Sequence, residues 1–232
     1  NKINGSLEQN GGEFYIGAPT QFVSLLPGIE GLTDGNVKLE VTDDVNLNNG
    51  RMEVNTVAED LVMFHRDINL RNTYRLINNG QFKISGNLSL ENNSYVQLAS
   101  SNNRLDVAGR LSAKESAQIN NSGWLRVANG VSLISSNESI SVLINEKNAR
   151  LDVLAQKEFS IGGKAKIQNK GIIAASGKTS LSSNSHMVND TGAVFQINGG
   201  SLTTNATLTN RGFLQFNGGT FDVSGSLINE SA

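Results

Sequence analysis

The sequence predicts an all-β protein, a parallel β-helix of about nine coils, from three observations. A unit recurs about every 23 residues, apolar and polar residues alternate within each unit, and Asn and Gly separate these short runs. Alternation with a period of two is typical of strands, because successive side chains of a strand point to opposite faces. Short strands in a coil-sized repeat indicate a solenoid, in which stacked coils bury together the apolar face that one coil cannot bury alone.

The repeat is clearest in segments 78–90 and 121–133, which overlay without a gap, and an earlier copy lies at 10–16. The first apolar residue after each Asn/Gly boundary serves as a marker, which gives Met52, Phe82, Leu105, Leu125, Leu151, Ile173, Phe195 and Leu214. Successive markers are 30, 23, 20, 26, 22, 22 and 19 residues apart. We therefore expect residues 37–232 to form β-helix repeats, and residues 1–36 to form an irregular N-terminal coil with a loop insertion.

Asn and Gly suit the corners of such coils. Both tolerate the left-handed backbone conformation of a tight turn, and stacked Asn side chains can hydrogen-bond from coil to coil. The apolar residues of the alternating runs are expected to point inward and to form the core: Phe82, Ile84, Leu88, Leu90, Leu105, Val107, Leu111, Leu125, Val127, Val131, Leu133, Leu151, Val153, Phe195, Ile197, Phe216, Phe221 and Val223.

Two stretches do not fit the period. Residues 17–36 contain both prolines, and we expect a loop there that covers the side of the prism. The interval from Met52 to Phe82 is long, which predicts a second excursion at residues 54–67. Residues 57–67 are the nearest candidate for a helix, but the segment is too short to be convincing.

Composition excludes several classes of function. Lys and Arg number 19 against 21 Asp and Glu, so the net charge of −2 opposes nucleic-acid binding. No Cys is present, which excludes disulfides, thiolate zinc sites and Cys nucleophiles. No stretch approaches the ~20 apolar residues of a transmembrane helix. The chain opens on Asn-Lys-Ile-Asn-Gly without an apolar leader, and we expect it to be a segment of a longer exported protein.

Motifs for catalysis or metal binding are weak, so we predict no enzyme activity, no cofactor and no metal site. His65-Arg66-Asp67 is similar to part of a kinase catalytic loop, but the other kinase motifs are missing. His186 has no second ligand at metal-binding spacing.

Acidic pairs leave one alternative open. Asp43-Asp44 and Glu59-Asp60 are the densest pairs, and Asp67 lies near the second. Carboxylates on adjacent coils could act as acid and base on a glycan or hold Ca²⁺. Adjacent residues in a strand face opposite ways, however, so neither pair is a ready-made dyad.

A face for ligand contact is predicted from basic and aromatic residues on neighbouring coils: Arg104, Arg110, Lys114, Trp124 and Arg126. A solvated charged face is the plainer interpretation, and a ladder that contacts acidic glycans is the sharper one. Tyr74 and Tyr95 are further rings that we expect at the surface, where a row of rings would favour sugar stacking.

The unit at 211–229, Arg-Gly-Phe-Leu-Gln-Phe-Asn-Gly-Gly-Thr-Phe-Asp-Val-Ser-Gly-Ser-Leu-Ile-Asn, resembles coils of secreted bacterial β-helix exoproteins. These are the passenger regions of autotransporters and the filamentous haemagglutinin-like exoproteins of two-partner secretion. The resemblance covers about residues 37–232. It implies a right-handed β-helix, a secreted or cell-surface location in bacteria, and a role in adhesion or virulence. The implied partners are a surface receptor or glycan and an outer-membrane translocator.

The first functional hypothesis is therefore a non-catalytic segment of a bacterial adhesin that provides a stiff stalk and a binding face. A carbohydrate-active β-helix enzyme or phage tail protein acting on polysaccharide is the second. A cytotoxic autotransporter passenger is the third.

Overall fold

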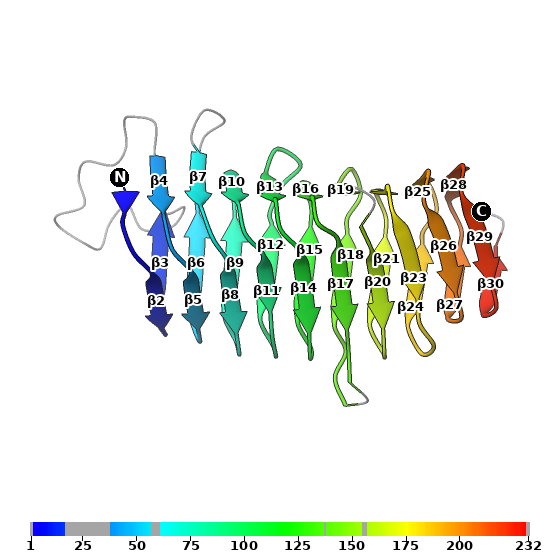
Figure 1. The fold of residues 1–232 in the computed structure, drawn as a ribbon, viewed down its shortest axis with the longest axis horizontal. Coiled ribbons are helices and arrows are strands. Elements are labelled where there is room, and N and C mark those ends of the chain that lie inside the picture. The colour runs from blue at the N-terminus through cyan, green and yellow to red at the C-terminus, as the bar shows by residue number, and fades with distance from the viewer. Residues whose placement is uncertain (1, 17–37, 57–60, 137, 155–156, 231–232) are drawn as a thin grey trace.

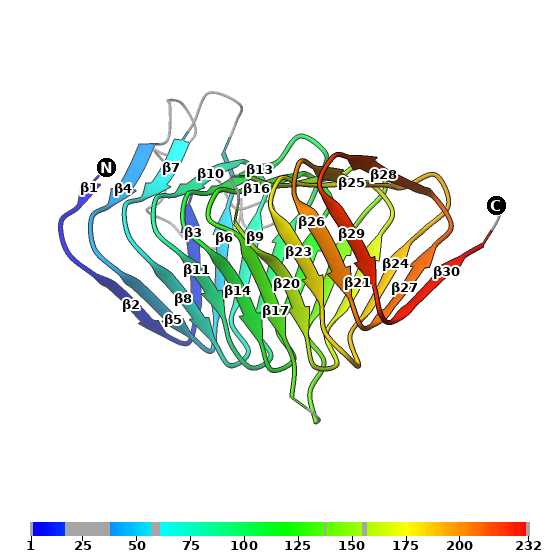
Figure 2. The same cartoon turned by 45° about the vertical axis from the view of Figure 1, so that its right-hand side comes forward.

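The computed structural model describes residues 2–16, 38–56, 61–136, 138–154 and 157–230. These residues form a right-handed parallel β-helix of three sheets with ten strands each, and none of them is helical. Each coil contributes one strand to sheet A, one to sheet B and one to sheet C, in that order, before the chain passes to the next coil. Figure 1 shows the coils advancing along the long axis from the N-terminus to the C-terminus, and Figure 2 shows the sheets as separate walls.

The strands of sheet A are β1 (Lys2–Ile3), β4 (Lys38–Val41), β7 (Leu61–Phe64), β10 (Gln81–Ile84), β13 (Arg104–Val107), β16 (Trp124–Val127), β19 (Arg150–Val153), β22 (Ile172–Ala175), β25 (Val194–Asn198) and β28 (Phe213–Asn217). Those of sheet B are β2 (Leu7–Asn10), β5 (Val45–Asn48), β8 (Ile68–Arg71), β11 (Leu88–Leu90), β14 (Leu111–Lys114), β17 (Val131–Ile134), β20 (Phe159–Gly162), β23 (Lys178–Leu181), β26 (Ser201–Thr204) and β29 (Thr220–Val223). Those of sheet C are β3 (Glu13–Ile16), β6 (Arg51–Val54), β9 (Arg75–Asn78), β12 (Tyr95–Leu98), β15 (Gln118–Asn121), β18 (Val142–Asn145), β21 (Lys166–Asn169), β24 (His186–Asn189), β27 (Thr207–Asn210) and β30 (Ser226–Asn229).

Seven of the sequence markers lie in register on the inner side of sheet A. Each pairs with the next through neighbouring strands: Phe82, Leu105, Leu125, Leu151, Ile173, Phe195 and Leu214. The predicted parallel β-helix is thus confirmed. The seven markers occupy the same position in successive coils, so their spacing in the sequence is the length of the coil. Nine strand-to-strand steps of about 4.8 Å give a stack about 43 Å long.

The first marker was misassigned. Met52 lies in sheet C, where it pairs with Phe14 and Leu76, and the sheet A residue that precedes Phe82 in the register is Val62, in the coil that follows Met52. The step from Val62 to Phe82 is 20 residues, so this coil is not long. The error arose because Asn49-Gly50 forms the corner between sheets B and C, although the sequence pattern is the same as at the corner between sheets C and A.

The predicted excursion at 54–67 is consequently wrong for most of its length. Residues 61–64 are strand β7, and Val62 and Phe64 are fully buried on its inner side. Residues 57–60 lie outside the described residues, as do the loop predicted at 17–36 and the boundary predicted between residues 36 and 37. Residues 2–16 already form the first coil, because β1, β2 and β3 pair with β4, β5 and β6.

The core residues predicted from the alternating pattern are confirmed, except for those in the last coil. The predicted residues from Phe82 to Ile197 are all buried. Phe216 and Val223 are half-buried and Phe221 is 46% exposed, although Phe221 pairs in register with the buried Leu202. These three face inward, but they belong to the outermost coil of the described residues, where no further coil covers them.

A ladder of asparagines, buried from Asn121 to Asn210 and exposed at Asn229, runs along the corner between sheets C and A. Each amide Nδ2 donates to the Oδ1 of the next Asn at 2.7 or 2.8 Å, through Asn121, Asn145, Asn169, Asn189, Asn210 and Asn229. The Nδ2 groups of four of them also donate to the backbone carbonyl of the first residue in the second sheet A strand that follows in the chain, as Asn145 does to Ile172 at 3.0 Å. Buried polar groups of this kind stabilise a structure only when they are satisfied, and here the stacking of coils satisfies them.

A second set of asparagines occupies the corner between sheets B and C. Asn49, Asn72 and Asn92 have φ values of 51, 56 and 58°, in the left-handed region. Asn92 Nδ2 donates to Asn72 Oδ1 at 3.0 Å in the coil below. Both properties expected of corner asparagines are therefore present at this corner, whereas the corner between sheets C and A shows the stacked hydrogen bonds.

The corners between sheets C and A alternate in length from coil to coil. Two residues connect β9 to β10, β15 to β16, β21 to β22 and β27 to β28. Five residues connect β12 to β13, and four connect β18 to β19 and β24 to β25. Each short corner between two long ones is therefore recessed.

Candidate functional site

The outer face of sheet A gathers most of the residues predicted for ligand contact. Its outward side chains form two rows, because inward and outward residues alternate along each strand. The first row is, in register, Gln81, Arg104, Trp124, Arg150, Ile172, Val194 and Phe213. The second row contains, in register, Lys83, Asp106, Arg126, Asp152, Ala174 and Gln196.

Trp124 is the centre of this face and is held in one orientation. The guanidinium of Arg104 lies 4.3 Å from the centre of the indole ring. The indole Nε1 donates a hydrogen bond of 2.8 Å to Asp152 Oδ2 in the next coil. The ring nevertheless remains 37% exposed. A ring fixed by two contacts loses little entropy when a ligand stacks on it.

Two Arg–Asp pairs flank the tryptophan. Arg104 Nε lies 3.0 Å from Asp106, and Arg150 Nε donates to both carboxylate oxygens of Asp152 at 2.9 and 2.8 Å. The hydrogen bond to Asp152 raises the pKa of the Arg150 guanidinium, although partial burial acts in the opposite direction. Arg150 is therefore a permanent cation with a fixed position.

The charge of this face is opposite in sign to that of the whole chain. Four cations, Lys83, Arg104, Arg126 and Arg150, lie on four successive strands with two carboxylates, Asp106 and Asp152. Lys83 and Arg126 are exposed. The outward side chains of these four strands thus have a formal charge of +2, whereas the chain has −2. We call the group Arg104, Trp124, Arg126 and Arg150 the sheet A patch.

The structure does not bring all predicted contact residues together. Arg104, Trp124 and Arg126 share the sheet A patch. Arg110 lies at the corner between sheets A and B, and Lys114 ends β14 in sheet B; both are exposed, but they do not share the sheet A face.

Arg150 and Asp152 were missed from the sequence, although a signal for them existed. The tetrapeptide Arg-Leu-Asp-Val occurs at 104–107 and again at 150–153, on the two strands that flank β16. The identical outward residues of these strands produce the two Arg–Asp pairs around Trp124.

The predicted surface tyrosines are placed differently from each other. Tyr74 is fully buried, and its hydroxyl donates to Gln9 Oε1 at 2.6 Å. Burial raises the pKa of the Tyr74 phenol well above its ordinary value. Tyr95 lies half-buried on the outer face of sheet C, with the guanidinium of Arg75 5.7 Å from its ring centre.

Two of the acidic residues considered for catalysis, Asp44 and Asp67, have structural partners. Asp44 Oδ1 accepts the backbone N–H of Asp67 at 3.2 Å, and Asp67 Oδ1 accepts the backbone N–H of Asn87 at 2.8 Å. These carboxylates therefore connect successive coils at the corner between sheets A and B. Glu59 and Asp60 lie outside the described residues.

The two histidines lie apart. His65 Nε2 is 3.8 Å from Glu40 Oε2, and His186 Nε2 is 3.4 Å from Thr209 Oγ1 on the outer face of sheet C. Within the described ranges, no three His, Asp or Glu side chains gather in a way that could hold a metal ion. Within the same ranges, no helix has the length and hydrophobicity required to cross a bilayer.

Comparisons with family models, with curated proteins and with solved structures found no match for this chain. Its function is therefore argued from the fold and from the sheet A patch alone.

Proposed function

We propose that this chain is a non-catalytic stalk segment of a secreted or surface-exposed bacterial adhesin, with the sheet A patch as its contact face. The observation that carries the proposal is Trp124, an exposed ring that two contacts hold in place among three arginines. Exposed aromatic and arginine side chains are the residue types most enriched at binding hot spots.

The stack of coils supports the role of a stalk. The strands of all but the two end coils pair on both sides, and the core continues through the stack without interruption. Contacts in such a solenoid are made between neighbouring coils, so the length of the stalk scales with the number of repeats. A face on a sheet is also more rigid than a loop, which favours recognition of a surface receptor or glycan.

Binding of labelled chain to intact epithelial and bacterial cells, measured by flow cytometry, tests this function. The double variant Trp124→Ala/Arg126→Ala is expected to lose at least tenfold in apparent affinity, because both side chains are exposed and have no role in the core. The matched control is Arg75→Ala/Tyr95→Ala, which removes the cation–aromatic pair on sheet C. Equal losses in both variants, or no binding by the unaltered chain, would contradict the proposal.

A further inference from the structure

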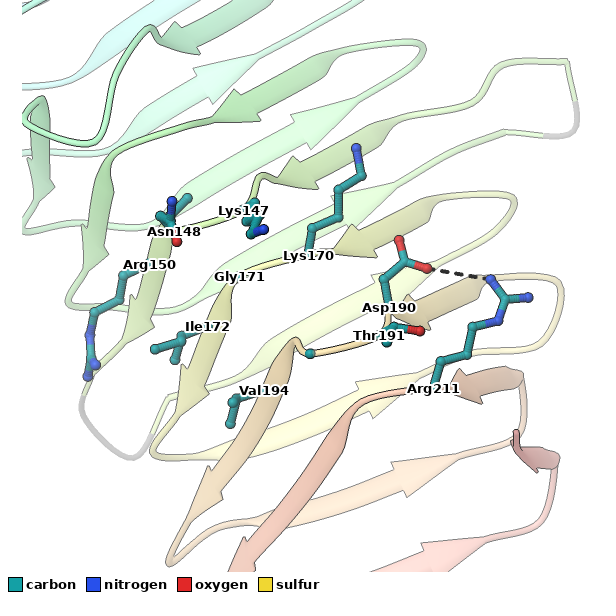
Figure 3. A pocket seen from close by; sticks show the side chains of 12 residues that line it. Lys147, Asn148, Arg150, Lys170, Gly171, Ile172, Asp190, Thr191, Val194 and Arg211 are labelled. Atoms are coloured by element: carbon teal, nitrogen blue, oxygen red, sulfur yellow. Dashed lines mark hydrogen bonds and ion pairs between the residues drawn. The ribbon is translucent and has the colours of Figure 1, made fainter. Parts of the chain in front are cut away.

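An open groove lies over the corner between sheets C and A, beside the sheet A patch. It has a volume of about 830 Å³ and crosses four coils, from Lys147 to Arg211. Its floor is the short corner 170–171 with Ile172, and the long corners 146–149 and 190–193 form its two sides. Figure 3 shows the side chains of Ile172 and Val194 next to each other, with Lys170, Asp190 and Arg211 farther along the corner.

The floor of the groove packs closely against the coil below it. A Cβ at Gly171 would lie 2.3 Å from the carbonyl oxygen of Ala149 and 2.5 Å from that of Glu146. Glycine is therefore required here by the approach of the long corner below. The adjoining floor is apolar, since Ile172 is 36% exposed and its register partner Val194 is half-buried.

Cations dominate the rim. Four basic residues and one carboxylate line the groove: Lys147, Arg150, Lys170, Arg211 and Asp190. Lys147 makes no ion pair with any other residue that the structure describes.

The other three cations are positioned by acids, and none of the three is fully covered. Lys170 Nζ lies 3.0 Å from Glu146, and Arg211 lies 2.7 Å from Glu230 and 3.4 Å from Asp190. The side chains of Lys170, Arg211 and Arg150 remain 36%, 43% and 47% exposed. Exposed pairs of this kind are weak, and an arginine has five N–H donors, so an incoming anion can share these groups.

The pairing of the sheets argues against a peptide as the occupant. Peptides commonly bind β proteins by adding a strand to a free edge. The strands at the groove, β19, β22 and β25, are each paired on both sides. An apolar floor with a cationic rim instead fits a sugar chain, which offers flat C–H faces to the floor and acid groups to the rim.

We propose that this groove binds an acidic oligosaccharide, a sugar chain that carries sulfate or carboxylate groups, along the axis of the β-helix. The site goes beyond the proposed contact face: its floor is made of different residues, and the two share only Arg150.

The test uses opposite charges at one position on the floor. Ile172→Glu and Ile172→Lys are compared for binding of a sulfated hexasaccharide by isothermal titration calorimetry. Ile172 is already partly exposed, so both variants are expected to fold, which a thermal melt checks. The Glu variant is expected to bind about tenfold more weakly than the unaltered chain, and the Lys variant as tightly or more tightly. Binding is also expected to weaken as salt is raised.

Gln118→Glu and Gln118→Lys are the matched controls, because Gln118 is exposed on sheet C and the pair alters net charge by the same amounts. They are expected to leave binding within about twofold. The proposal would be overturned if the two Ile172 variants bound the sulfated hexasaccharide equally well. It would also be overturned if the unaltered chain bound the desulfated hexasaccharide or hexaglutamate as tightly as the sulfated hexasaccharide.

Trp124→Ala separates this site from the proposed contact face. The groove predicts that this variant retains affinity for the hexasaccharide even if it no longer binds cells. Loss of hexasaccharide binding in Trp124→Ala with none in Ile172→Glu would place the ligand on the sheet A patch and overturn the groove alone.

Discussion

Single asparagines connect the coils of this protein. Asn169 is in the middle of the buried ladder: its Oδ1 accepts from Asn145 and from the backbone N–H of Gly171, and its Nδ2 donates to Asn189 and to the carbonyl of Val194. Its side chain thus makes four hydrogen bonds in a place that water does not reach. In the sequence this arrangement appears as Asn-x-Gly, because the Asn169 side chain accepts the backbone N–H of the glycine two residues later.

Asn169→Ala is expected to lower the free energy of unfolding by about 1–3 kcal/mol, because it leaves buried donors and acceptors without partners. Urea denaturation followed by circular dichroism measures the change. Asn102→Ala, at an exposed position of the corner 99–103, is expected to stay within about 0.5 kcal/mol of the unaltered chain. Similar effects at both positions would show that the ladder does not stabilise the fold.

The buried phenol of Tyr74 predicts a dependence of stability on alkaline pH. Its pKa is raised in the folded state above the ordinary value of about 10. The resulting stabilisation is complete below pH 10 and is lost as the pH rises further, because the unfolded chain then ionises this phenol and the folded chain does not.

Tyr74→Phe removes the pH-dependent contribution of this phenol to stability. The free energy of unfolding of the variant should therefore fall less steeply between pH 10 and 12 than that of the unaltered chain. Tyr95→Phe, which alters a half-buried ring on sheet C, serves as the control. Parallel curves for Tyr74→Phe and the unaltered chain would contradict the role assigned to this phenol.

At the scale of the element, each strand depends on the coils above and below it. Phe195 is fully buried between its register partners Ile173 and Leu214. Phe221 occupies an inward position as well, but on the last described coil, where 46% of it is exposed.

Phe195→Ala is therefore expected to cost about 3–5 kcal/mol of stability, the usual range for a large aromatic removed from a core. For Phe221→Ala we expect about 1 kcal/mol or less, since part of the ring is already in water. The pair is measured by the same denaturation experiment. A larger loss at Phe221 than at Phe195 would mean that the last coil is covered in solution.

The strands could be predicted from the sequence because their period is local. Leu125 and Val127 flank a single outward residue, and this alternation predicts a strand. The same alternation recurs when the chain returns to sheet A one coil later, so the spacing between recurrences predicts the register of the strands. Met52 was misassigned because Asn-Gly occurs at two corners of the coil and spacing alone does not tell them apart.

The sites were harder to predict than the strands. The sheet A patch was foreseen only in part, since Arg150 joins it from 26 residues beyond Trp124. The groove depends on corners of unequal length in neighbouring coils, such as 146–149 and 170–171. That difference becomes visible only once the strand ends are known.

At the scale of the whole molecule, the account depends on one geometrical claim, that the coils stack in register along a single axis. The sequence contains no Cys, so pairs of introduced cysteines can be spin-labelled without background. The outer row of sheet B offers suitable half-buried positions, because Asn46, Ser112, Ser160 and Thr203 lie in one register line.

The most direct test is the distance from a label at Asn46→Cys to labels at Ser112→Cys, Ser160→Cys and Thr203→Cys, measured by pulsed electron paramagnetic resonance. These positions are three, five and seven coil steps away, which predicts distances of about 14, 24 and 34 Å. The account predicts this even increase of about 4.8 Å per coil. Distances that level off, or that fail to follow the order of the coils, would contradict it.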